Sequence, residues 1–529
     1  MRKNYGWQIV QVVLGVVIGA LITLTVVNYR NKRHLISTRY ESWPKLNLVL
    51  DLLDKNYVDD VDHDAVQESA IQAALSRLDP HSVYLPPVEL SASEEELSAH
   101  FDGIGIQFNV PNDTAIVLEV IAGGPSEKVG MQMGDRLLKV DDEVIAGVHF
   151  PQDSMVRRIK GPSGTKVTVT VQRGKEVIPF EITRGKIPLH SVEAAFMVEP
   201  KVGYLRLGKF SRTTFEECRL AAQDLVRQGM EHLIFDVRNN SGGYMDQALL
   251  LSNDYLSIGD TIVYIEGKHR KREVYQADGR GVLQDVGLTV LISENAASAS
   301  EIFAGAIQDN DRGTIVGRRS FGKGLVQEPF FFKDKSGIRL TVARYYTPSG
   351  RCIQKPYGGE ENYGYDIYKR YADGEVFSAD SVRLDKSDVH HTRSGREVYG
   401  GGGIMPDVFV PLDTTRTTQF YQKVNAKATP MRFASAVFDR YKARLQQIDS
   451  FEEMDQFLKG IDWKVEFPAY AREKDGIPCT EAEWDAGAAY LVPQLQALVA
   501  RYSPLGENAF YRYYLPVDTT VQVALERLR

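Results

Sequence analysis

The stretch LTVLISENAASASEIFAGAI, residues 288–307, carries the main fold signal of this 529-residue chain. It begins with an apolar run typical of a buried strand and continues with apolar residues at helical spacing. A strand that leads directly into a helix is the repeating unit of an α/β domain. Residues 233–238 form another apolar run, followed by a glycine-containing turn and a helical stretch. We therefore predict an α/β core over residues 186–412.

The turn between the strand and the helix carries Ser298. The first turn of a helix has unpaired N–H groups and a partial positive charge. Both suit a nucleophile whose attack on a carbonyl creates an oxyanion. The spacing Ser298-x-x-Glu301 also fits a capping box, in which the serine has a structural role. The two interpretations are compatible, because Ser300 could also serve the helix start.

A serine nucleophile needs a base, and no histidine of the core lies in a recognisable motif. A lysine can replace it where burial lowers the lysine pKa. Lys323 lies between glycines before an apolar run, and Gln327, on the same face of an extended strand, could orient its amine. A solvated turn is the structural alternative. Gly317-x-x-x-x-Gly322-Lys323 also resembles a nucleotide-binding loop, but Gly324 replaces the expected Ser or Thr and a strand follows.

Residues 95–185 have a different character, because glycines separate short apolar runs. This pattern predicts a small strand-rich domain, and its order resembles a PDZ domain, most specifically over residues 123–140. Such domains add a peptide C-terminus as a strand and hold its carboxylate with loop N–H groups. A tight turn before a buried strand is the structural alternative. The matching loop consists of Gly103, Ile104, Gly105 and Ile106.

The N-terminus predicts the compartment. Residues 9–27 carry no charge and nearly span a hydrocarbon layer at about 1.5 Å per residue. We predict an uncleaved transmembrane signal anchor over residues 8–28, and a cleaved signal peptide is the alternative. The chain's net charge of −7 disfavours nucleic-acid binding. Its three cysteines are too far apart for a zinc motif or a disulfide framework, so we expect no metal site.

Six motifs in this order resemble the C-terminal processing peptidases, also called tail-specific proteases. They are LDPHS at 78–82, DVRNNSGG at 236–243, SASEI at 298–302, FGKG at 321–324 with Gln327, YTPSGR at 346–351 and GIMPD at 403–407. The resemblance covers about residues 40–412. The C-terminal extension and the polar excursion at residues 355–400 are similar to those of members from Bacteroides-like bacteria.

The resemblance implies a serine endopeptidase with a Ser298–Lys323 dyad, in which Gln327 assists the lysine. The oxyanion would be held by backbone N–H groups, namely those of Ala299 and of Gly242 or Gly243. It also implies that the enzyme needs neither a metal nor another cofactor. A non-catalytic PDZ scaffold or chaperone with an inactive peptidase core is the alternative, and the presence of both Ser298 and Lys323 argues against it.

The family also implies partners and a location. The substrates would be proteins or peptides with free, mostly apolar C-termini, cleaved in the periplasm by an enzyme anchored in the bacterial inner membrane. An adaptor or a homo-oligomer is compatible with this role. The predicted fold is α/β and multi-domain, with a cytoplasmic N-terminus (1–7), the anchor (8–28), a helical segment (29–94), a PDZ-like β-rich domain (95–185), a peptidase core (186–412) and a mostly helical C-terminal extension (413–529).

Overall fold

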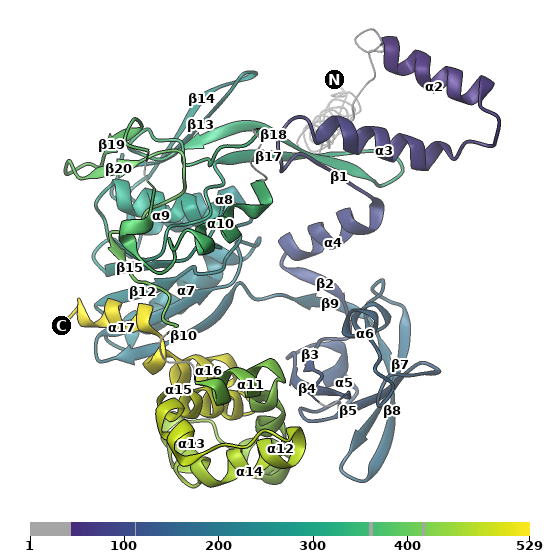
Figure 1. Cartoon of the computed structure of the whole chain (residues 1–529), viewed down its shortest axis with the longest axis vertical. Coiled ribbons are helices and arrows are strands. Elements are labelled where there is room, and N and C mark those ends of the chain that lie inside the picture. Colours follow the sequence, from purple (N-terminus) through teal and green to yellow (C-terminus); the bar gives the residue numbers. More distant parts are fainter. Residues whose placement is uncertain (1–43, 112, 359–362, 384, 415–417) are drawn as a thin grey trace, which may run out of the picture. The chain divides into compact units, whose positions relative to one another are not determined.

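The computed structural model describes residues 44–111, 113–358, 363–383, 385–414 and 418–529 (Figure 1). The chain divides into two compact units. In the first, residues up to Ser93 combine with Val326–Val342 and a short segment that begins at Tyr357. All other described residues belong to the second unit. The anchor predicted at residues 8–28 lies outside the described residues, and within them no helix is long and apolar enough to cross a bilayer.

The first unit combines helices with a small antiparallel sheet. Its elements are α2 (Pro44–Asn56), α3 (His63–Leu75), β1 (Val83–Leu85), β17 (Leu325–Phe331) and the first half of β18 (Gly337–Tyr346). Buried Asp79 closes the turn before β1, because its carboxylate accepts a hydrogen bond from the Ser82 N–H at 2.9 Å and another from the Ser82 hydroxyl at 2.5 Å. The LDPHS motif is therefore a side-chain-stabilised turn. Helix α4 (Pro87–Leu97) follows β1 in the chain.

An antiparallel sheet with the order β3-β4-β5-β7-β8, and with β6 beside β5, forms the predicted β-rich domain. In β7, Val167, Val169 and Val171 are buried at every second position, so one face of the strand packs into the core. β3 is an edge strand of this sheet. The elements are β2 (His100–Gly103), β3 (Ile106–Asn109), β4 (Ala115–Val120), α5 (Pro125–Lys128), β5 (Arg136–Val140), β6 (Glu143–Val144), α6 (Gln152–Ile159), β7 (Lys166–Arg173), β8 (Glu176–Thr183) and β9 (Gly185–Pro188).

The predicted α/β core is confirmed. Its sheet has the order β10-β11-β12-β15-β16-β21, and every neighbouring pair except β10 and β11 is parallel. The central strands β12 and β15 are almost entirely buried, as expected when helices cover both faces of a sheet. The strands are β10 (Val192–Glu199), β11 (Val202–Leu207), β12 (His232–Asp236), β15 (Gly287–Ile292), β16 (Thr314–Gly317) and β21 (Val408–Phe409).

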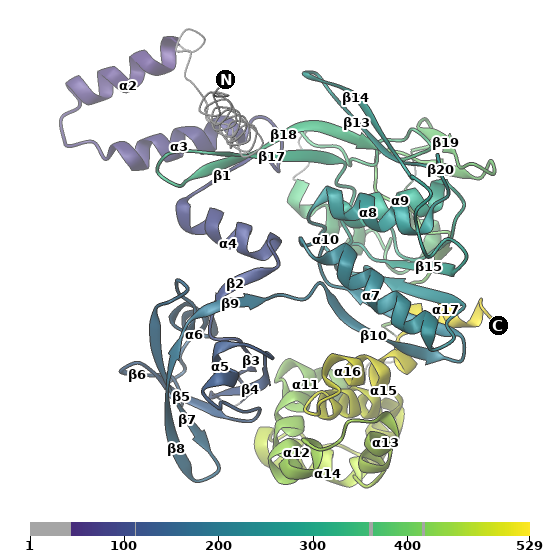
Figure 2. The same ribbon diagram turned by 180° about the vertical axis from the view of Figure 1, so that it is seen from behind.

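Helices α7 (Thr214–Arg227), α8 (Met245–Tyr255) and α9 (Ala299–Asp309) follow strands of this sheet (Figure 2). Every residue of α9 is buried. The Phe303 ring lies 5.0 Å from that of Phe235 and 5.9 Å from that of Tyr255, measured between centroids. Three buried aromatic rings thus fix α9 against β12 and α8. The remaining elements are β13 (Thr261–Gly267), β14 (Arg270–Gln276), α10 (Asp366–Ala372), β19 (Val389–His391) and β20 (Glu397–Tyr399).

The C-terminal region is helical, as predicted. Its helices are α11 (Gln419–Ala426), α12 (Thr429–Leu445), α13 (Phe451–Lys459), α14 (Trp463–Asp475), α15 (Glu481–Ala500), α16 (Gly506–Tyr514) and α17 (Thr519–Glu526). Most of them share one apolar core, in which Phe433 packs edge-on against Phe467. Helix α17 differs, because Val521 and Leu525 belong to the same buried cluster as Ile234 and Leu291 of the parallel sheet.

Candidate active site

Ser298 lies at the turn between β15 and α9 in an unusual backbone conformation. Its φ is +57° and its ψ is −114°. An L-residue with a side chain rarely adopts this region, and holding one there costs on the order of 1–3 kcal/mol. Such strain persists only where the surrounding structure enforces it, and it concentrates at functional sites. The conformation therefore singles out Ser298 among the serines of the core.

The carboxylate of Glu301 connects the Ser298 turn to the loop that carries Lys323. Glu301 is completely buried. Burial raises its pKa, although the hydrogen bonds it accepts act in the opposite direction. The donors are the N–H groups of Ser298 at 2.9 Å, Lys323 at 2.8 Å and Gly322 at 2.7 Å, and the hydroxyl of Ser320 at 2.5 Å. One carboxylate thus fixes the backbone positions of Ser298 and Lys323 together.

The Ser298-x-x-Glu301 spacing can be interpreted both as a helix cap and as the turn of a nucleophile, and the structure supports the helix cap directly. The Glu301 half of the capping box is present, because the Glu301 side chain accepts from the Ser298 N–H. The same side chain extends well beyond the helix start to the Lys323 loop. The motif is therefore a cap that also serves a long-range contact, and the sequence alone gave no sign of the second role.

Tyr345 of β18 makes a second link between the two residues. Its hydroxyl lies 3.1 Å from the Ser298 carbonyl oxygen and 2.5 Å from the Lys323 carbonyl oxygen, so it can donate to either. Tyr345 is fully buried, and burial together with the charge of Glu301 raises its pKa. The phenol therefore keeps its proton and remains a donor. Sequence reasoning missed this residue, because no local signal marks it.

Gly242 lies directly against the Ser298 turn. Its φ is +97°, and a Cβ at this position would lie 2.7 Å from the Ala297 carbonyl oxygen and 2.9 Å from the Ala299 nitrogen. These neighbours are backbone atoms, which cannot move aside as a flexible side chain can. Only glycine fits here. The glycines of the DVRNNSGG motif therefore bring a second backbone segment next to Ser298.

The two glycines differ in what their N–H groups do. The Gly242 N–H donates to the Asn240 side-chain oxygen at 2.9 Å, and the Gly242 carbonyl accepts from the Phe210 N–H at 3.0 Å. In a trans peptide the C=O and the next N–H point in opposite directions, so the Gly243 N–H points away from Phe210. Among the described residues, neither the Gly243 N–H nor the Ala299 N–H has an acceptor.

A buried charge cluster supports the strand that leads to these glycines. Asp236, at the end of β12, is completely buried and accepts hydrogen bonds from Arg238 at 2.7 Å, Arg206 at 3.0 Å and the Tyr204 hydroxyl at 2.7 Å. Burial opposes its ionisation, but the charges of Arg238 and Arg206 outweigh this effect and lower the pKa of Asp236 to about 2. Asp236 is therefore ionised at neutral pH and anchors both arginines.

Gln327 lies on β17 in the first unit, where its side-chain amide donates to the His81 carbonyl oxygen. Two of the sequence motifs, LDPHS and the segment after FGKG, thus meet at this hydrogen bond. Sequence reasoning treated them as separate. The predicted help that Gln327 gives to Lys323 stays a prediction.

In the loop of residues 103–106, which is predicted to bind a carboxylate, two backbone carbonyl groups accept hydrogen bonds. The Ile104 carbonyl accepts from the Ser126 N–H at 2.9 Å, and the Gly105 carbonyl accepts from the Ile121 N–H at 3.0 Å. Gly105 has φ +79°, and Ile106 opens the edge strand β3. Because these carbonyls are tied down, the loop conformation is fixed at the end of an edge strand.

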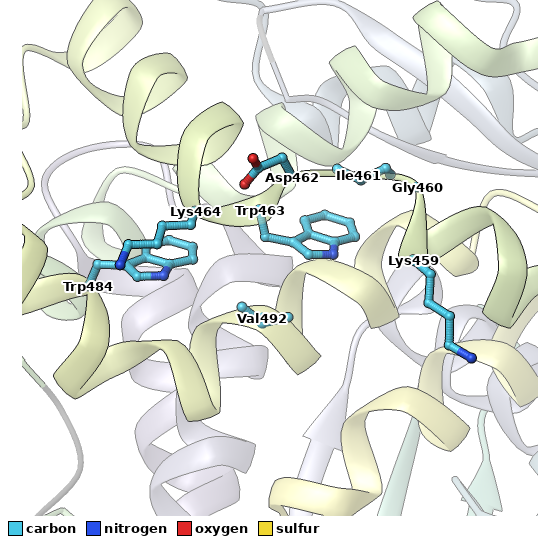
Figure 3. A pocket seen from close by; sticks show the side chains of 8 residues that line it. All are labelled: Lys459, Gly460, Ile461, Asp462, Trp463, Lys464, Trp484 and Val492. Carbon is cyan, nitrogen blue, oxygen red and sulfur yellow. The ribbon is translucent and has the colours of Figure 1, made fainter.

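A separate hollow of about 540 Å³ lies among the C-terminal helices and is lined by Trp463, Trp484 and Val492, among others (Figure 3). Lys464 at its border already pairs with Glu481 at 2.8 Å and with Asp485 at 3.2 Å. This hollow does not contain the strained serine or the glycine turn. We therefore place the candidate active site at Ser298.

A β-rich PDZ domain beside an α/β core with this serine turn defines the PDZ-bearing serine peptidases. The chain belongs to peptidase family S41, the family of C-terminal processing proteases. The S41 family profile matches residues 201–363, which include Ser298 and Lys323. The PDZ domain profile matches residues 103–183, and that of the activating protease CtpB N-terminal domain matches residues 22–87.

Curated relatives agree with this family. A probable CtpA-like serine protease of Staphylococcus aureus (strain COL) is 32% identical over 352 residues, which cover 66% of this chain and 70% of the relative. The protein of the same description from Staphylococcus epidermidis (strain ATCC 12228 / FDA PCI 1200) is 32% identical over 353 residues, with coverages of 66% and 71%. The chain is a serine-type peptidase and hence a hydrolase.

A solved structure of the photosystem II D1 C-terminal processing protease is 27% identical and covers 70% of this chain and 87% of that chain. Its TM-score is 0.37.

Proposed function

We propose that the protein is an endopeptidase in which Ser298 is the nucleophile and Lys323 is the general base, and that its PDZ domain selects substrates by their C-terminal tails. One observation carries the catalytic part of this proposal. The Glu301 carboxylate binds the backbone N–H groups of both residues, at 2.9 and 2.8 Å. A dyad needs its two members held in a constant relation, and this shared anchor supplies it.

The reaction follows from acyl-transfer chemistry. Neutral Lys323 accepts the proton of the Ser298 hydroxyl as the oxygen attacks the peptide carbonyl. The lysine then gives this proton to the leaving amine, and the C–N bond breaks to leave an acyl-enzyme. Lys323 next takes a proton from water, whose oxygen attacks the ester and releases the acid. Ser298 regains its proton, so the cycle needs no metal or other cofactor.

The oxyanion of each tetrahedral intermediate requires donors that are free to bind it. We assign this role to the N–H groups of Ala299 and Gly243. The Gly242 N–H already donates to Asn240, so using it would break an existing hydrogen bond. The role of Gly242 is then steric, because its missing side chain allows the two backbone segments to meet.

Substrate selection is assigned to the edge strand β3 and the loop of residues 103–106. An extended peptide can pair with the edge of β3, and the loop N–H groups can hold its terminal carboxylate. The partners are then proteins or peptides with free, mostly apolar C-termini. We also place the catalytic part on the periplasmic side of the bacterial inner membrane, with residues 8–28 as the anchor. The uncharged sequence at residues 9–27 supports this placement.

The dyad is tested by Ser298→Ala and Lys323→Ala in the purified protein, assayed with an unfolded protein that has an apolar C-terminus. Each variant should lose cleavage by at least about 10³-fold, with an unchanged circular dichroism spectrum. The exposed residues Ser257 and Lys268 serve as matched controls, and their alanine variants should keep wild-type activity. Cleavage that persists in either dyad variant contradicts the proposal and favours another nucleophile or base.

A further inference from the structure

The C-terminal region contacts the charge cluster that supports the glycine turn at two places. Tyr511 of α16 packs on Arg206, whose guanidinium carbon lies 5.1 Å from the ring centroid, and Asp518 pairs with Arg238. Asp518 immediately precedes α17, which packs in the buried cluster of the peptidase sheet. Its Oδ1 accepts a hydrogen bond from Arg238 Nη1 at 2.9 Å, and its Oδ2 lies 2.8 Å from Arg238 Nη2. Two contacts of this kind form a bidentate pair, which is the strongest geometry for an arginine and a carboxylate. Both side chains are 13% exposed.

Asp518 is the second carboxylate that pairs with Arg238 in the cluster around Asp236. Arg206 and Arg238 bring two positive charges into this cluster, and Asp236 supplies one negative charge. Asp518 supplies the second negative charge on the side of Arg238, and the more exposed Glu193 pairs with Arg206 at 2.7 Å. Without Asp518, Arg238 would keep only Asp236 as an ion-pair partner in a poorly solvated site, and it would share that carboxylate with Arg206.

Arg238 is connected to the active site by the next few residues of the chain. Asn239 follows it with φ +61°, so the backbone turns sharply there. Asn240 is completely buried, and its carbonyl accepts from the Ala297 N–H at 3.0 Å and from the Ser300 hydroxyl at 2.9 Å. Its side chain holds the Gly242 N–H. A shift of Arg238 would therefore move Asn240, which binds residues on both sides of Ser298 and also the Gly242 N–H.

We propose that Asp518 is a positioning residue of the peptidase, which holds Arg238 and through it the glycine turn that faces Ser298. The C-terminal region then contributes to catalysis, because it positions residues of the active site. This inference rests on the proposed function, because it assumes that the glycine turn binds the oxyanion.

The variant Asp518→Asn tests this role. Asp518 is also the N-cap of α17, because its side chain accepts from the N–H groups of Thr520 and Val521. Asparagine caps helices as well as aspartate does, so the variant keeps the cap and removes the negative charge that pairs with Arg238. We expect kcat to fall about tenfold, while KM and the thermal unfolding midpoint stay close to the wild-type values. Asp518→Glu, which restores the charge, should recover most of the lost kcat.

Asp462→Asn is the matched control. Asp462 is the N-cap of α14, and its side chain accepts from the Val465 N–H, so the same change is made at another C-terminal helix. This control should keep the wild-type kcat. A wild-type kcat in Asp518→Asn, or an equal loss in both variants, overturns the inference. So does a loss of kcat that Asp518→Glu does not reverse.

The Ser298→Ala variant, measured in parallel, separates this inference from the proposed function. If Ser298→Ala is inactive while Asp518→Asn is as active as the wild type, only the positioning role of Asp518 fails. If Ser298→Ala still cleaves the substrate, the proposed function itself fails.

Discussion

Two glycine loops of this protein are proposed to hold a negatively charged oxygen with backbone N–H groups, and they are built differently. In the loop at residues 103–106, a Cβ on Gly105 would first meet the end of the Ile187 side chain, at 3.1 Å. In the turn at residues 241–243, a Cβ on Gly242 would meet backbone oxygen and nitrogen atoms, at 2.7 and 2.9 Å. Gly105 is thus bordered first by side chains, those of Ile187 and Pro125, whereas Gly242 is bordered by backbone atoms.

The difference matches the two tasks. A terminal carboxylate is a stable ligand that can bind to a slightly adjusted loop, with a small loss of affinity. An oxyanion exists only in and near the transition state, so its donors must already be in position. The comparison predicts that the same substitution has different consequences in the two loops.

Gly242→Ala should have the largest effect. The new methyl group collides with backbone of the Ser298 turn, so the turn must move. We expect kcat to fall by at least about 10²-fold, as for the loss of an oxyanion donor, with little change in the affinity of the PDZ domain for an apolar C-terminal peptide. Gly460→Ala, at a helix end with φ −78°, is the control and should be active. A kcat within threefold of the wild type would remove the distinction between the loops.

Gly105→Ala should have an intermediate effect, seen in binding. Its φ of +79° is unfavourable for alanine by roughly 1–2 kcal/mol. We expect the free loop of the variant to relax from this conformation, so that binding must restore it at a loss of affinity of about tenfold. We expect KM for a substrate with an apolar tail to rise by about this factor, with kcat unchanged. The same substrate with an amidated C-terminus should show a similarly raised KM in the wild type and no further rise in the variant. A fall in kcat alone would contradict the assignment.

The smallest effect concerns acid stability. The turn at residues 241–243 follows a strand end held by ionised Asp236, whose folded-state pKa is about 2 against an ordinary value of 3.8. A carboxyl with a lowered pKa stabilises the fold above pH 3.8, and this stabilisation is lost as the pH falls through 2. The free energy of unfolding, measured with urea, should therefore decrease between pH 4 and pH 2.

Asp236→Asn gives the comparison for this measurement. It should be less stable at pH 5, and its free energy of unfolding should depend less on pH over the same interval. Parallel pH dependences in the two proteins would mean that other carboxyl groups cause the acid sensitivity.

The sequence was sufficient for the fold class and for the order of the domains that the family profiles match. Apolar runs such as residues 288–292 are typical of strands that are buried on both faces, and the helical stretch that follows this run indicates an α/β arrangement. The position of Ser298 between a strand and a helix was predictable from the sequence, and its role as the nucleophile stays a prediction. The help of Gln327, the carboxylate loop and the membrane anchor stay predictions.

The links between distant segments could not be predicted. Glu301 looked like a local cap, yet it binds the Lys323 loop 22 residues further along the chain. The distance along the chain from Arg238 to Asp518 is 280 residues, and neither residue has a motif that points to the other. Such pairs depend on how the sheet brings segments together, and a single sequence has no local pattern that records this.

The packing of α17 has a consequence for how the enzyme is made. Val521 and Leu525 complete a buried cluster of apolar residues. Other residues of this cluster lie on strands that are synthesised more than 200 residues earlier. While the ribosome is still producing the helical region, the sheet lacks this cover and Arg238 lacks its second carboxylate. The nascent chain thus carries Ser298 and Lys323 long before the scaffold around them is finished.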